Sequence, residues 1–451
     1  MDYQHALDWL ESHTNLEGTA PPPGSARSRQ LRDNLPKAGD TDGLSLGAMA
    51  ELLSALGDPQ HSYRVIHVTG TNGKGSTTRF AAAILATMGL SVGSYTSPNL
   101  VKVNERIGWD GNMISDLDLA QVLTLLADVE PLLSQRPSRF ELLTAAALTW
   151  FAELGVEVAV VEVGLLGRYD ATNLVEADVA VVTNIGKDHT DGADGWRQRV
   201  ASEKAGIIKP GSRVVLGSPM GDLRPIFDQE PSVATYEFGA DFDLESNVVA
   251  LGGRAVDIRT PHGRLESVHV PFHGAHQGQN LATAVMAVEA FFDRPLELEL
   301  IEEAMATVEI PGRFEIVGRN PIVILDGAHN PDGAVAAKRT LDEEFARLGS
   351  WVLVFGMLVG KDPVEMLRAI GAEDFDAVIV TQPAWSRALP ASEVAAAAAT
   401  LGIDVEIVPD VVDAFARARS VTNDDDLILV AGSLYVIGEL RAKASAATTD
   451  N

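Results

Sequence analysis

The sequence predicts an α/β protein of two domains, each built on a mainly parallel β-sheet. Short β-branched runs alternate with helical stretches along most of the chain, which is typical of parallel sheets covered by helices. A glycine-rich turn joins the first strand to the next helix, as in nucleotide-binding α/β units. A length of 451 residues also favours two or three domains over one.

We predict an N-terminal domain over residues 1–311. It begins with an amphipathic helix at the N-terminus and a second helix over 46–56, separated by a Pro- and Gly-rich loop. The sequence then predicts strands at 65–69, 91–95, 156–163, 179–184 and 213–217 and helices at 75–88, 116–133, 140–154, 196–207 and 277–292. Residues 232–271 change to short alternating runs with glycine, which indicates antiparallel strands.

A second alternation begins after a turn at residues 310–313, so residues 312–451 are predicted to form a smaller C-terminal domain. The expected strands and helices are 321–326, 332–346, 351–356, 362–370, 375–381, 391–401, 404–408, 410–419, 426–431 and 433–442. Five strand–helix pairs of this length are typical of a dinucleotide-type fold. The tail from Ala444 is expected to be disordered.

The composition excludes several classes of function. Lys and Arg total 35 against 63 Asp and Glu, so the formal charge of −28 disfavours duplex nucleic acid and anionic membranes as partners. The absence of cysteine removes disulfides, thiolate nucleophiles and Cys-based metal sites, and is compatible with the cytoplasm. We expect no secretory signal in the acidic N-terminal segment and no membrane span, because no apolar run approaches ~20 residues.

The most informative motif is the turn Gly70–Thr77, with the sequence GTNGKGST. Between a strand and a helix, such a turn presents backbone N–H groups and the positive helix end to an anion. Lys74 can reach the β- and γ-phosphates of a nucleotide, and a hydroxyl of Ser76 or Thr77 can approach Mg²⁺. The spacing is shorter than in the usual GxxxxGK[ST] pattern. The alternative is a glycine-rich turn that binds nothing.

Three further polar residues follow strands of the same predicted sheet. Glu162 ends an otherwise apolar strand, so it is either a Mg²⁺ ligand facing the phosphate loop or part of a structural salt bridge. His189 lies just past the next strand, where a structural histidine is the alternative. Lys204 follows on a helix and is either functional or part of a surface Glu–Lys pair.

The second domain offers weaker signals of the same kind. Its first strand ends in the sequence DGAHNP, which places Asp326 and His329 at a strand end that can face the first domain. Arg313 in the linker is a cation that can reach a nucleotide phosphate. Asn280 lies near the start of a helix and can hydrogen-bond a base or ribose.

Taken together and in this order, these segments closely resemble the folylpolyglutamate synthase and dihydrofolate synthase group of the Mur ligase superfamily. The matching segments, spread over residues 65–439, read IHVTGTNGKGST, YTSPNLVKVNERI, EVGLLGRYDATN, DHT, SEKAGIIKPG, HQGQN, IPGRFEIV, DGAHNPDG and AGSLYVIGE. The spacing also fits, with 27 residues from Glu162 to His189 and 15 from His189 to Lys204.

The resemblance implies a P-loop ATPase domain of the Mur ligase central type, a smaller C-terminal ligase domain, and ATP between them. It implies ATP contacts at Asn72, Gly73, Lys74, Gly75, Ser76, Asn280, Arg313, Asp326 and His329. It implies Mg²⁺ ligands among Thr96, Ser97, Glu162 and His189. Lys204 matches a carbamylated lysine, N6-carboxylysine, and catalysis is assigned to Lys74, His189 and Lys204.

The same resemblance implies that the pterin substrate contacts Ser138, Arg139, Phe140, Glu141, Asp170, Ala171 and Thr172. Three positions depart from the family pattern. Leu166 replaces the first glycine of a Gly-Gly pair, Asn99 stands where histidine is frequent, and Gly360 stands where aspartate is usual.

The implied activity is ATP-driven amide formation in folate biosynthesis. A carboxylate is activated as an acyl phosphate and is then attacked by the amine of L-glutamate. The acceptor is dihydropteroate, the γ-carboxylate of a reduced folate, or both, and we expect a cytoplasmic monomer. The alternatives are a sister ligase acting on a peptidoglycan precursor and a nucleotide-gated binding protein without ligase chemistry.

Overall fold

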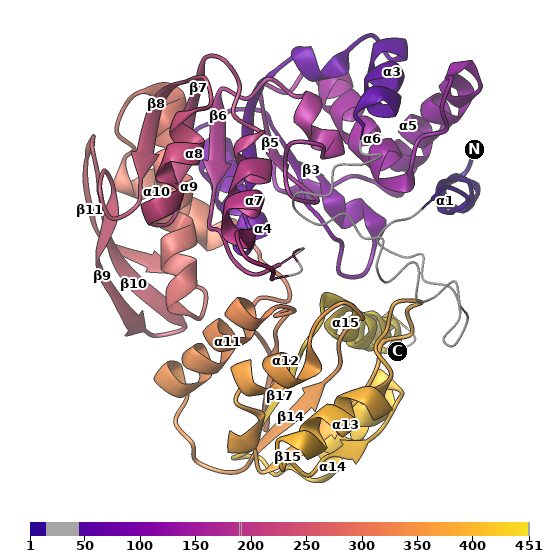
Figure 1. Cartoon of the computed structure of the whole chain (residues 1–451), viewed down its shortest axis with the longest axis vertical. Helices are drawn as coiled ribbons and strands as arrows, with labels where there is room; N and C mark the ends of the chain where they lie inside the picture. Colours follow the sequence, from indigo (N-terminus) through magenta and orange to yellow (C-terminus); the bar gives the residue numbers. More distant parts are fainter. Residues whose placement is uncertain (15–44, 189, 191, 450–451) are drawn as a thin grey trace.

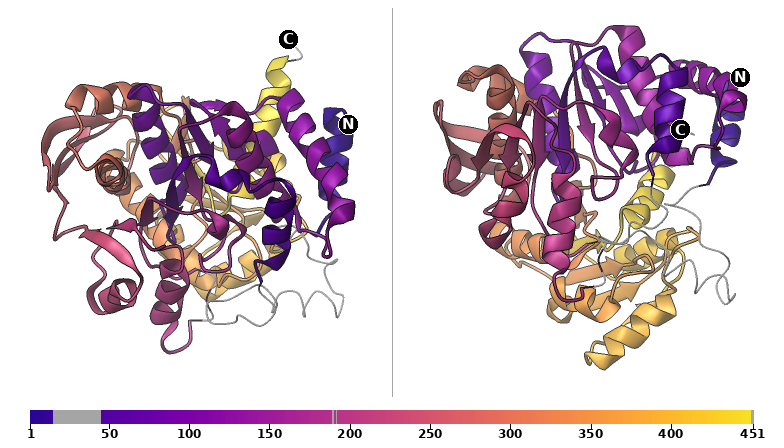
Figure 2. Two further views of the ribbon diagram at one scale, coloured as in Figure 1. Left: turned by 90° about the horizontal axis from the view of Figure 1, so that it is seen from above. Right: turned by 45° about the horizontal axis from the view of Figure 1, so that its top comes forward.

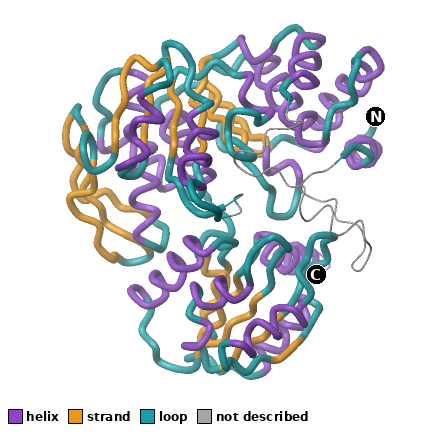
Figure 3. The backbone as a smooth tube through the Cα atoms, in the orientation of Figure 1, coloured by secondary structure: helices purple, strands orange, loops and turns teal. Residues whose placement is uncertain are grey.

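The computed structural model, shown in Figure 1, describes residues 1–14, 45–188, 190 and 192–449. The chain builds an eight-stranded sheet and a three-stranded sheet first and a six-stranded sheet afterwards. In Figures 1 and 3 the six-stranded part lies below the other two, and the chain passes between the parts after α10 (Leu298–Thr307).

The eight-stranded sheet has the order β4-β3-β2-β5-β1-β6-β7-β8. Six of its strands run parallel, and their carboxyl ends therefore lie at one edge. These are β1 (Arg64–Thr69), β2 (Val92–Tyr95), β5 (Val158–Glu162), β6 (Val179–Val182), β7 (Ser212–Leu216) and β8 (Ser232–Glu237). The short strands β3 (Ile107–Trp109) and β4 (Asn112–Met113) extend the sheet in antiparallel fashion at its other side.

Helices cover both faces of this sheet because its central strands are apolar on both sides. One face packs against α4 (Lys74–Thr87), α9 (Ala275–Phe292) and α10. The other face packs against α3 (Gly47–Ala55), α5 (Asp116–Val129), α6 (Arg139–Leu154), α7 (Trp196–Ala205) and α8 (Arg224–Asp228), with α1 (Tyr3–Glu11) outside α5 and α6. Figure 2 gives two further views of this layering.

The three-stranded antiparallel sheet consists of β9 (Asp243–Ala250), β10 (Gly253–Thr260) and β11 (Gly263–Val270). Its buried residues, including Val256 and Ile258, join the apolar cluster around α9. The sheet therefore fixes α9, the helix that leads from it back to the carboxyl ends of the parallel strands.

The six-stranded sheet has the order β12-β13-β17-β14-β15-β16, in which only β12 is antiparallel. Its strands are β12 (Glu315–Arg319), β13 (Ile322–Leu325), β14 (Trp351–Phe355), β15 (Ala377–Val380), β16 (Glu406–Ile407) and β17 (Leu427–Ala431). One face packs against α11 (Pro331–Glu344), α12 (Pro363–Ala369) and α13 (Ala391–Thr400), the other against α14 (Val411–Ser420) and α15 (Leu434–Thr449).

The structure confirms the α/β class and corrects several elements. The strand over Ser232–Glu237 is parallel to β7 and belongs to the large sheet, not to an antiparallel one. It lies at the edge of that sheet and is partly exposed along its length, so it lacks the continuous apolar run of a buried parallel strand. The sequence analysis missed α10, β12 and the β3–β4 hairpin. Helix α15 continues to Thr449, so the prediction of disorder from Ala444 is wrong over 444–449.

Two other predictions concern the N-terminal segment and membranes. The Pro- and Gly-rich loop predicted before α3 falls, over 15–44, outside the described residues. Among the described helices, none is both long enough and apolar enough to cross a membrane.

Candidate active site

The loop Gly70–Gly73, called the phosphate loop below, lies at the carboxyl end of β1 and leads into α4. Gly73 takes a left-handed conformation with φ of +82° at the N-cap position, and no side chain caps the helix. The first-turn N–H groups of α4 are therefore available to an anion. Lys74 is the first residue of α4, and its ammonium donates to the carbonyl of Thr71 at 3.3 Å.

Residues that follow β6 hold this loop in place. The side-chain oxygen of Asn184 accepts from the backbone N–H of Asn72 at 3.0 Å, and the Thr183 hydroxyl donates to the carbonyl of Asn72 at 2.6 Å. A Cβ on Gly70 would lie 1.8 Å from the Thr183 hydroxyl oxygen, and Gly70 has a φ of +146°. Glycine is therefore required where the loop crosses the end of β6.

Glu162 ends β5 beside the first turn of α4. Its Oε2 accepts from the backbone N–H of Ser97 at 2.9 Å, and a Cβ on Gly75 would lie 3.4 Å from the same oxygen. Burial raises the pKa of this carboxyl, and Lys74 opposes that shift. Ser97 also lines the pocket, whereas the hydroxyl of Thr96 donates away to the carbonyl of Glu105 at 3.4 Å.

The surroundings of Glu162 fit a hard cation. The carboxylate is only 3% exposed and has no ion pair with any described residue, so a salt bridge does not offset its burial. Oxygen ligands from a carboxylate and a serine hydroxyl are those that Mg²⁺ prefers. In the described ranges no three acidic or His side chains are placed so that they could hold a metal ion together, but His189 lies outside those ranges.

Lys204 is buried on α7, which excludes the exposed Glu–Lys pair that the sequence left open. Its side chain is directed to the phosphate loop, where Nζ donates to the carbonyl of Gly70 at 2.7 Å. Burial and the neighbouring Lys74 hold the pKa of the Lys204 amine well below its usual value. The helix thus places an amine of low proton affinity next to the phosphate loop.

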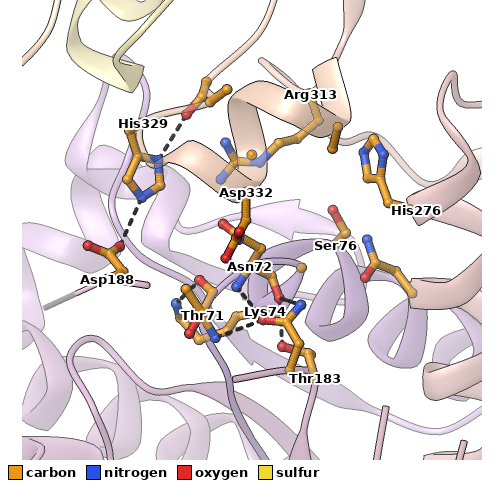
Figure 4. Close-up of a pocket in the computed structure, with 18 of the residues that line it drawn as sticks. Thr71, Asn72, Lys74, Ser76, Thr183, Asp188, His276, Arg313, His329 and Asp332 are labelled. Atoms are coloured by element: carbon orange, nitrogen blue, oxygen red, sulfur yellow. Dashed lines mark hydrogen bonds and ion pairs between the residues drawn. The ribbon is translucent and has the colours of Figure 1, made fainter. Parts of the chain in front are cut away.

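The two domains face each other across one pocket, shown in Figure 4. The first domain contributes the phosphate loop, Ser97 and Glu162. The second contributes Arg313 and the segment after β13, which includes Asp326 and His329. Further residues that line the pocket are Thr183, Asn184, Asp188, His276, Gln277, Asn280 and Asp332.

Several contacts fix the facing segments to each other. The side-chain amides of Asn72 and Asn330 pair reciprocally, at 2.9 and 3.3 Å, across the domain boundary. His329 Nε2 lies 3.5 Å from the Asp188 carboxylate, which also contacts Lys361. Both carboxylate oxygens of Asp326 accept backbone N–H groups, so it shapes the turn that presents Arg313 and His329.

The start of α9 supplies the remaining wall of the pocket. Asn280 Nδ2 donates to Gln277 Oε1 at 3.0 Å, and a Cβ on Gly73 would lie 2.3 Å from Asn280 Oδ1. The Nε2 of Gln277 is buried without a partner in the described part of the chain. Burial lowers the pKa of His276 to about 4, so this ring is neutral near pH 7.

The segments assigned to the pterin substrate make local contacts and do not line this pocket. Ser138 and Glu141 form a capping box at the start of α6. Arg139 pairs with Glu11 at 2.8 Å, and the Phe140 ring closely approaches Gly164. Asp170 accepts from Thr172 and from the N–H of Leu165, while Ala171 begins a short helical turn.

The three departures from the family pattern also have positions in the structure. Leu166 has a left-handed φ of +59° and packs against Val200 of α7 outside the pocket. Asn99 accepts from Arg106 Nε at 2.8 Å, and Gly360 lies in open space with a φ of +95°. Leu166 therefore carries backbone strain, because only glycine adopts this conformation without cost.

Sequence reasoning missed Thr183, Asn184, His276, Asn330 and Asp332. Thr183 and Asn184 had a usable signal, because polar residues directly after a buried strand mark the ligand edge of a parallel sheet. His276 and Asn330 lie in the matching segments HQGQN and DGAHNPDG, but nothing local indicated their contacts, since their partners are set by the packing of α9 and α11.

Comparison with known proteins gives matching family models for both domains. The Mur ligase middle domain matches residues 68–288, and the glutamate ligase domain of Mur ligases matches residues 312–434. The dihydrofolate synthase/folylpolyglutamate synthase of Mycobacterium tuberculosis is 36% identical over an alignment 419 residues long, which covers 86% of this chain and 82% of that protein.

Two solved structures extend the likeness to the fold. Mycobacterium tuberculosis folylpolyglutamate synthase complexed with ADP has a TM-score of 0.88 at 31% identity, covering 98% of each chain. A bifunctional folylpolyglutamate synthase/dihydrofolate synthase with Mn, AMPPNP and L-glutamate bound has a TM-score of 0.80 at 27% identity, covering 95% of this chain and 100% of the other. The protein therefore belongs to the folylpolyglutamate synthase and dihydrofolate synthase group of the Mur ligase family.

Proposed function

We propose that the protein is an ATP- and Mg²⁺-dependent ligase that joins L-glutamate to dihydropteroate, to the γ-carboxylate of a reduced folate, or to both. One observation supports this most strongly. The uncapped start of α4, the buried Glu162 and the cationic Arg313 of the second domain line a single pocket. The names of the relatives supply the substrate class.

In the first step, a carboxylate oxygen of the acceptor attacks the γ-phosphorus of ATP, and ADP leaves with the electron pair of the broken P–O bond. The product is an acyl phosphate. Lys74 and the N–H groups of α4 bind the phosphates and stabilise the charge that develops on them. Glu162, Ser97 and His189 would hold Mg²⁺, which would supply further positive charge to the phosphate oxygens.

In the second step, the neutral amine of L-glutamate attacks the acyl carbon, and inorganic phosphate leaves. The nitrogen loses one proton, which gives the amide. Arg313 and His329 extend from the second domain toward the phosphates, and Asn280 contacts the nucleotide from α9. Closure of the two domains excludes water, which would otherwise hydrolyse the acyl phosphate.

We further propose that Lys204 carries a carbamate. Its neutral amine would attack CO₂ and lose a proton, which converts a cationic side chain into an anionic one. The depressed pKa of the amine supports this reaction, because only the unprotonated form is nucleophilic. The carbamate oxygens would then help to organise the metal and water beside the phosphate loop.

The pterin contacts are assigned to the segments Ser138–Glu141 and Asp170–Thr172. In this structure their polar atoms are engaged within the segments or with neighbouring residues. Their proposed role is therefore to shape the acceptor site through Phe140 and the loop that Asp170 holds, with backbone groups and rearranged side chains available to the substrate.

The test is release of phosphate from ATP, measured with and without L-glutamate and with each acceptor. We expect release that requires both L-glutamate and either dihydropteroate or a reduced folate. Release that requires a muramoyl-peptide acceptor instead would favour the sister ligases of peptidoglycan synthesis. ATP binding without any acceptor-dependent release would favour the nucleotide-gated binding protein.

The proposal also includes the domain boundary, the cellular location and the oligomeric state. We place the domain boundary at residues 311 and 312 and expect a cytoplasmic monomer. Light scattering after size exclusion should give a mass near 47.9 kDa. Twice that mass would contradict the monomer.

A further inference from the structure

The loop Thr96–Lys102 links the metal-binding edge of the first domain to the second domain. It leaves the end of β2 and leads into a short helical turn over Val103–Arg106. Near its start, the backbone N–H of Ser97 donates to Glu162 at 2.9 Å. Farther along, Leu100 joins the apolar cluster formed by the six-stranded sheet, α14 and α15.

The contact between Leu100 and the second domain is close and involves the backbone. A Cβ on Gly438 of α15 would lie 2.2 Å from the carbonyl oxygen of Leu100. A Cβ on Gly312 would lie 3.5 Å from the Leu100 side chain and 2.7 Å from Ile437. The loop therefore rests directly on α15, and residue 438 must lack a side chain for this fit.

One carboxylate braces the loop between these two contacts. The backbone N–H groups of Leu100, Val101 and Lys102 donate to Glu105 at 2.7, 3.0 and 2.8 Å, and both carboxylate oxygens are used. Hydrogen bonds to an ionised acceptor are about twice as strong as neutral ones. Three successive amides on one anion therefore hold an irregular segment in a single conformation.

We propose that Glu105 is a positioning residue that makes this loop a rigid coupling between the metal site and the second domain. Docking of Leu100 on α15 fixes Ser97 against Glu162, and metal binding in turn favours the docked arrangement, since such coupling is reciprocal. This inference rests on the proposed function, because that function assigns the metal to Glu162 and Ser97.

The test measures Mn²⁺ binding in the presence of ADP by electron paramagnetic resonance, so no turnover is needed. Glu105→Ala should weaken Mn²⁺ binding about 10-fold or more, as is common when a residue that orients a metal ligand is removed. Glu105→Asp should restore part of the affinity, because it keeps the charge. Leu100→Ala and Gly438→Ala should weaken binding as well, although Gly438 lies in the other domain.

Matched controls separate this coupling from general damage. Glu51 also accepts a backbone N–H and a hydroxyl, both from Ser134, but lies on α3 away from the site, so Glu51→Ala should leave Mn²⁺ binding unchanged. Leu401→Ala should also leave Mn²⁺ binding unchanged. It truncates a partly buried leucine of the second domain, on the face of the six-stranded sheet opposite to the one that Leu100 contacts. Alanine ordinarily stabilises a helix relative to glycine, so Gly438→Ala should fold.

Hydrogen exchange shows whether the brace itself has been released. In Glu105→Ala, the amides of residues 100–102 should exchange faster while the core strands keep their protection. Unchanged Mn²⁺ binding in that variant would overturn the positioning role. Weaker binding in Glu105→Ala but not in Leu100→Ala and Gly438→Ala would overturn the coupling between domains.

The proposed function fails on a different measurement. If the wild type binds Mn²⁺ with ADP but shows no glutamate-dependent release of phosphate, the ligase assignment is wrong. The coupling between the loop and the second domain can then still be measured by Mn²⁺ binding in the variants. If the wild type does not bind Mn²⁺ with ADP, the metal assignment and this inference both fall.

Discussion

The starts of α4 and α6 provide the sharpest contrast within the first domain. Both helices begin at polar motif residues that the family resemblance assigns to ligands. At α4 no side chain caps the helix, and the first-turn N–H groups face the pocket. At α6 the side chains of Ser138 and Glu141 satisfy the backbone N–H groups of Glu141 and Ser138. An open helix start can bind an anion directly, whereas a closed one mainly stabilises the fold.

The largest expected effect comes from the open helix. Lys74→Ala should lower kcat about 10²–10³-fold, because it removes a cation from the charge that develops on the phosphates. The midpoint of thermal unfolding should change little, since Lys74 makes one long hydrogen bond to Thr71. Arg339→Ala is the control, because Arg339 is an exposed cation on α11 that pairs with Glu343 and does not line the pocket. A kcat near that of the wild type for Lys74→Ala would contradict the assignment of the loop.

The next effect tests the carboxylate beside that helix. Glu162→Gln keeps the size of the side chain but removes its charge, so the Mg²⁺ concentration for half-maximal activity should rise about 10–100-fold. Glu157→Gln is the control, because Glu157 precedes the same strand and also accepts a backbone N–H, from Ser91 at 3.0 Å. An unchanged Mg²⁺ titration would make Glu162 a structural residue.

How much the sequence predicts depends on how local the evidence is. The phosphate loop was predictable because a buried strand followed by several glycines can be recognised within a few residues. Glu162 was predictable because a carboxylate at the end of an apolar strand is an equally local pattern. Lys204 was predicted through the family resemblance, but its neighbours on the helix alone left a surface Glu–Lys pair open, since only the packing of α7 brings its amine to Gly70, 134 residues earlier in the chain. The parallel β8 was misread for a related reason, because its edge position leaves it partly exposed and without the continuous apolar run of a buried parallel strand.

A third effect concerns stability at low pH and comes from the buried contacts of the second segment assigned to the pterin, Asp170–Thr172. His67 of β1 is fully buried, and its Nε2 lies 2.9 Å from the hydroxyl of Thr172, which donates to Asp170. Burial lowers the pKa of His67 to about 3. The neutral ring therefore stabilises the fold above the unfolded pKa of about 6.5, and this contribution is lost as the pH falls below that value.

Chemical unfolding at pH 7 and pH 5 measures this contribution. Protonation of His67 in the unfolded chain should cost about 2 kcal/mol over that interval. His67→Gln keeps a donor for Thr172 without the titration, so its stability should depend less on pH by that amount. His61→Gln, at an exposed position, is the control and should keep the wild-type dependence. An unaltered dependence in His67→Gln would show that folding does not lower the pKa of His67.

The smallest effect decides whether the closed helix start contacts substrate at all. Ser138→Ala should cost about 1 kcal/mol of unfolding free energy, because it removes an N-cap. Ser115→Ala is a close match, since Ser115 caps α5 in the same way, with an N–H to hydroxyl distance of 3.0 Å. If Ser138 only caps α6, both variants should lose similar stability and keep the same KM for the pteroate or folate acceptor. If Ser138 binds the acceptor, as the family resemblance implies, Ser138→Ala should raise that KM while Ser115→Ala does not. KM for ATP should stay constant in both variants, because neither serine lines the nucleotide pocket.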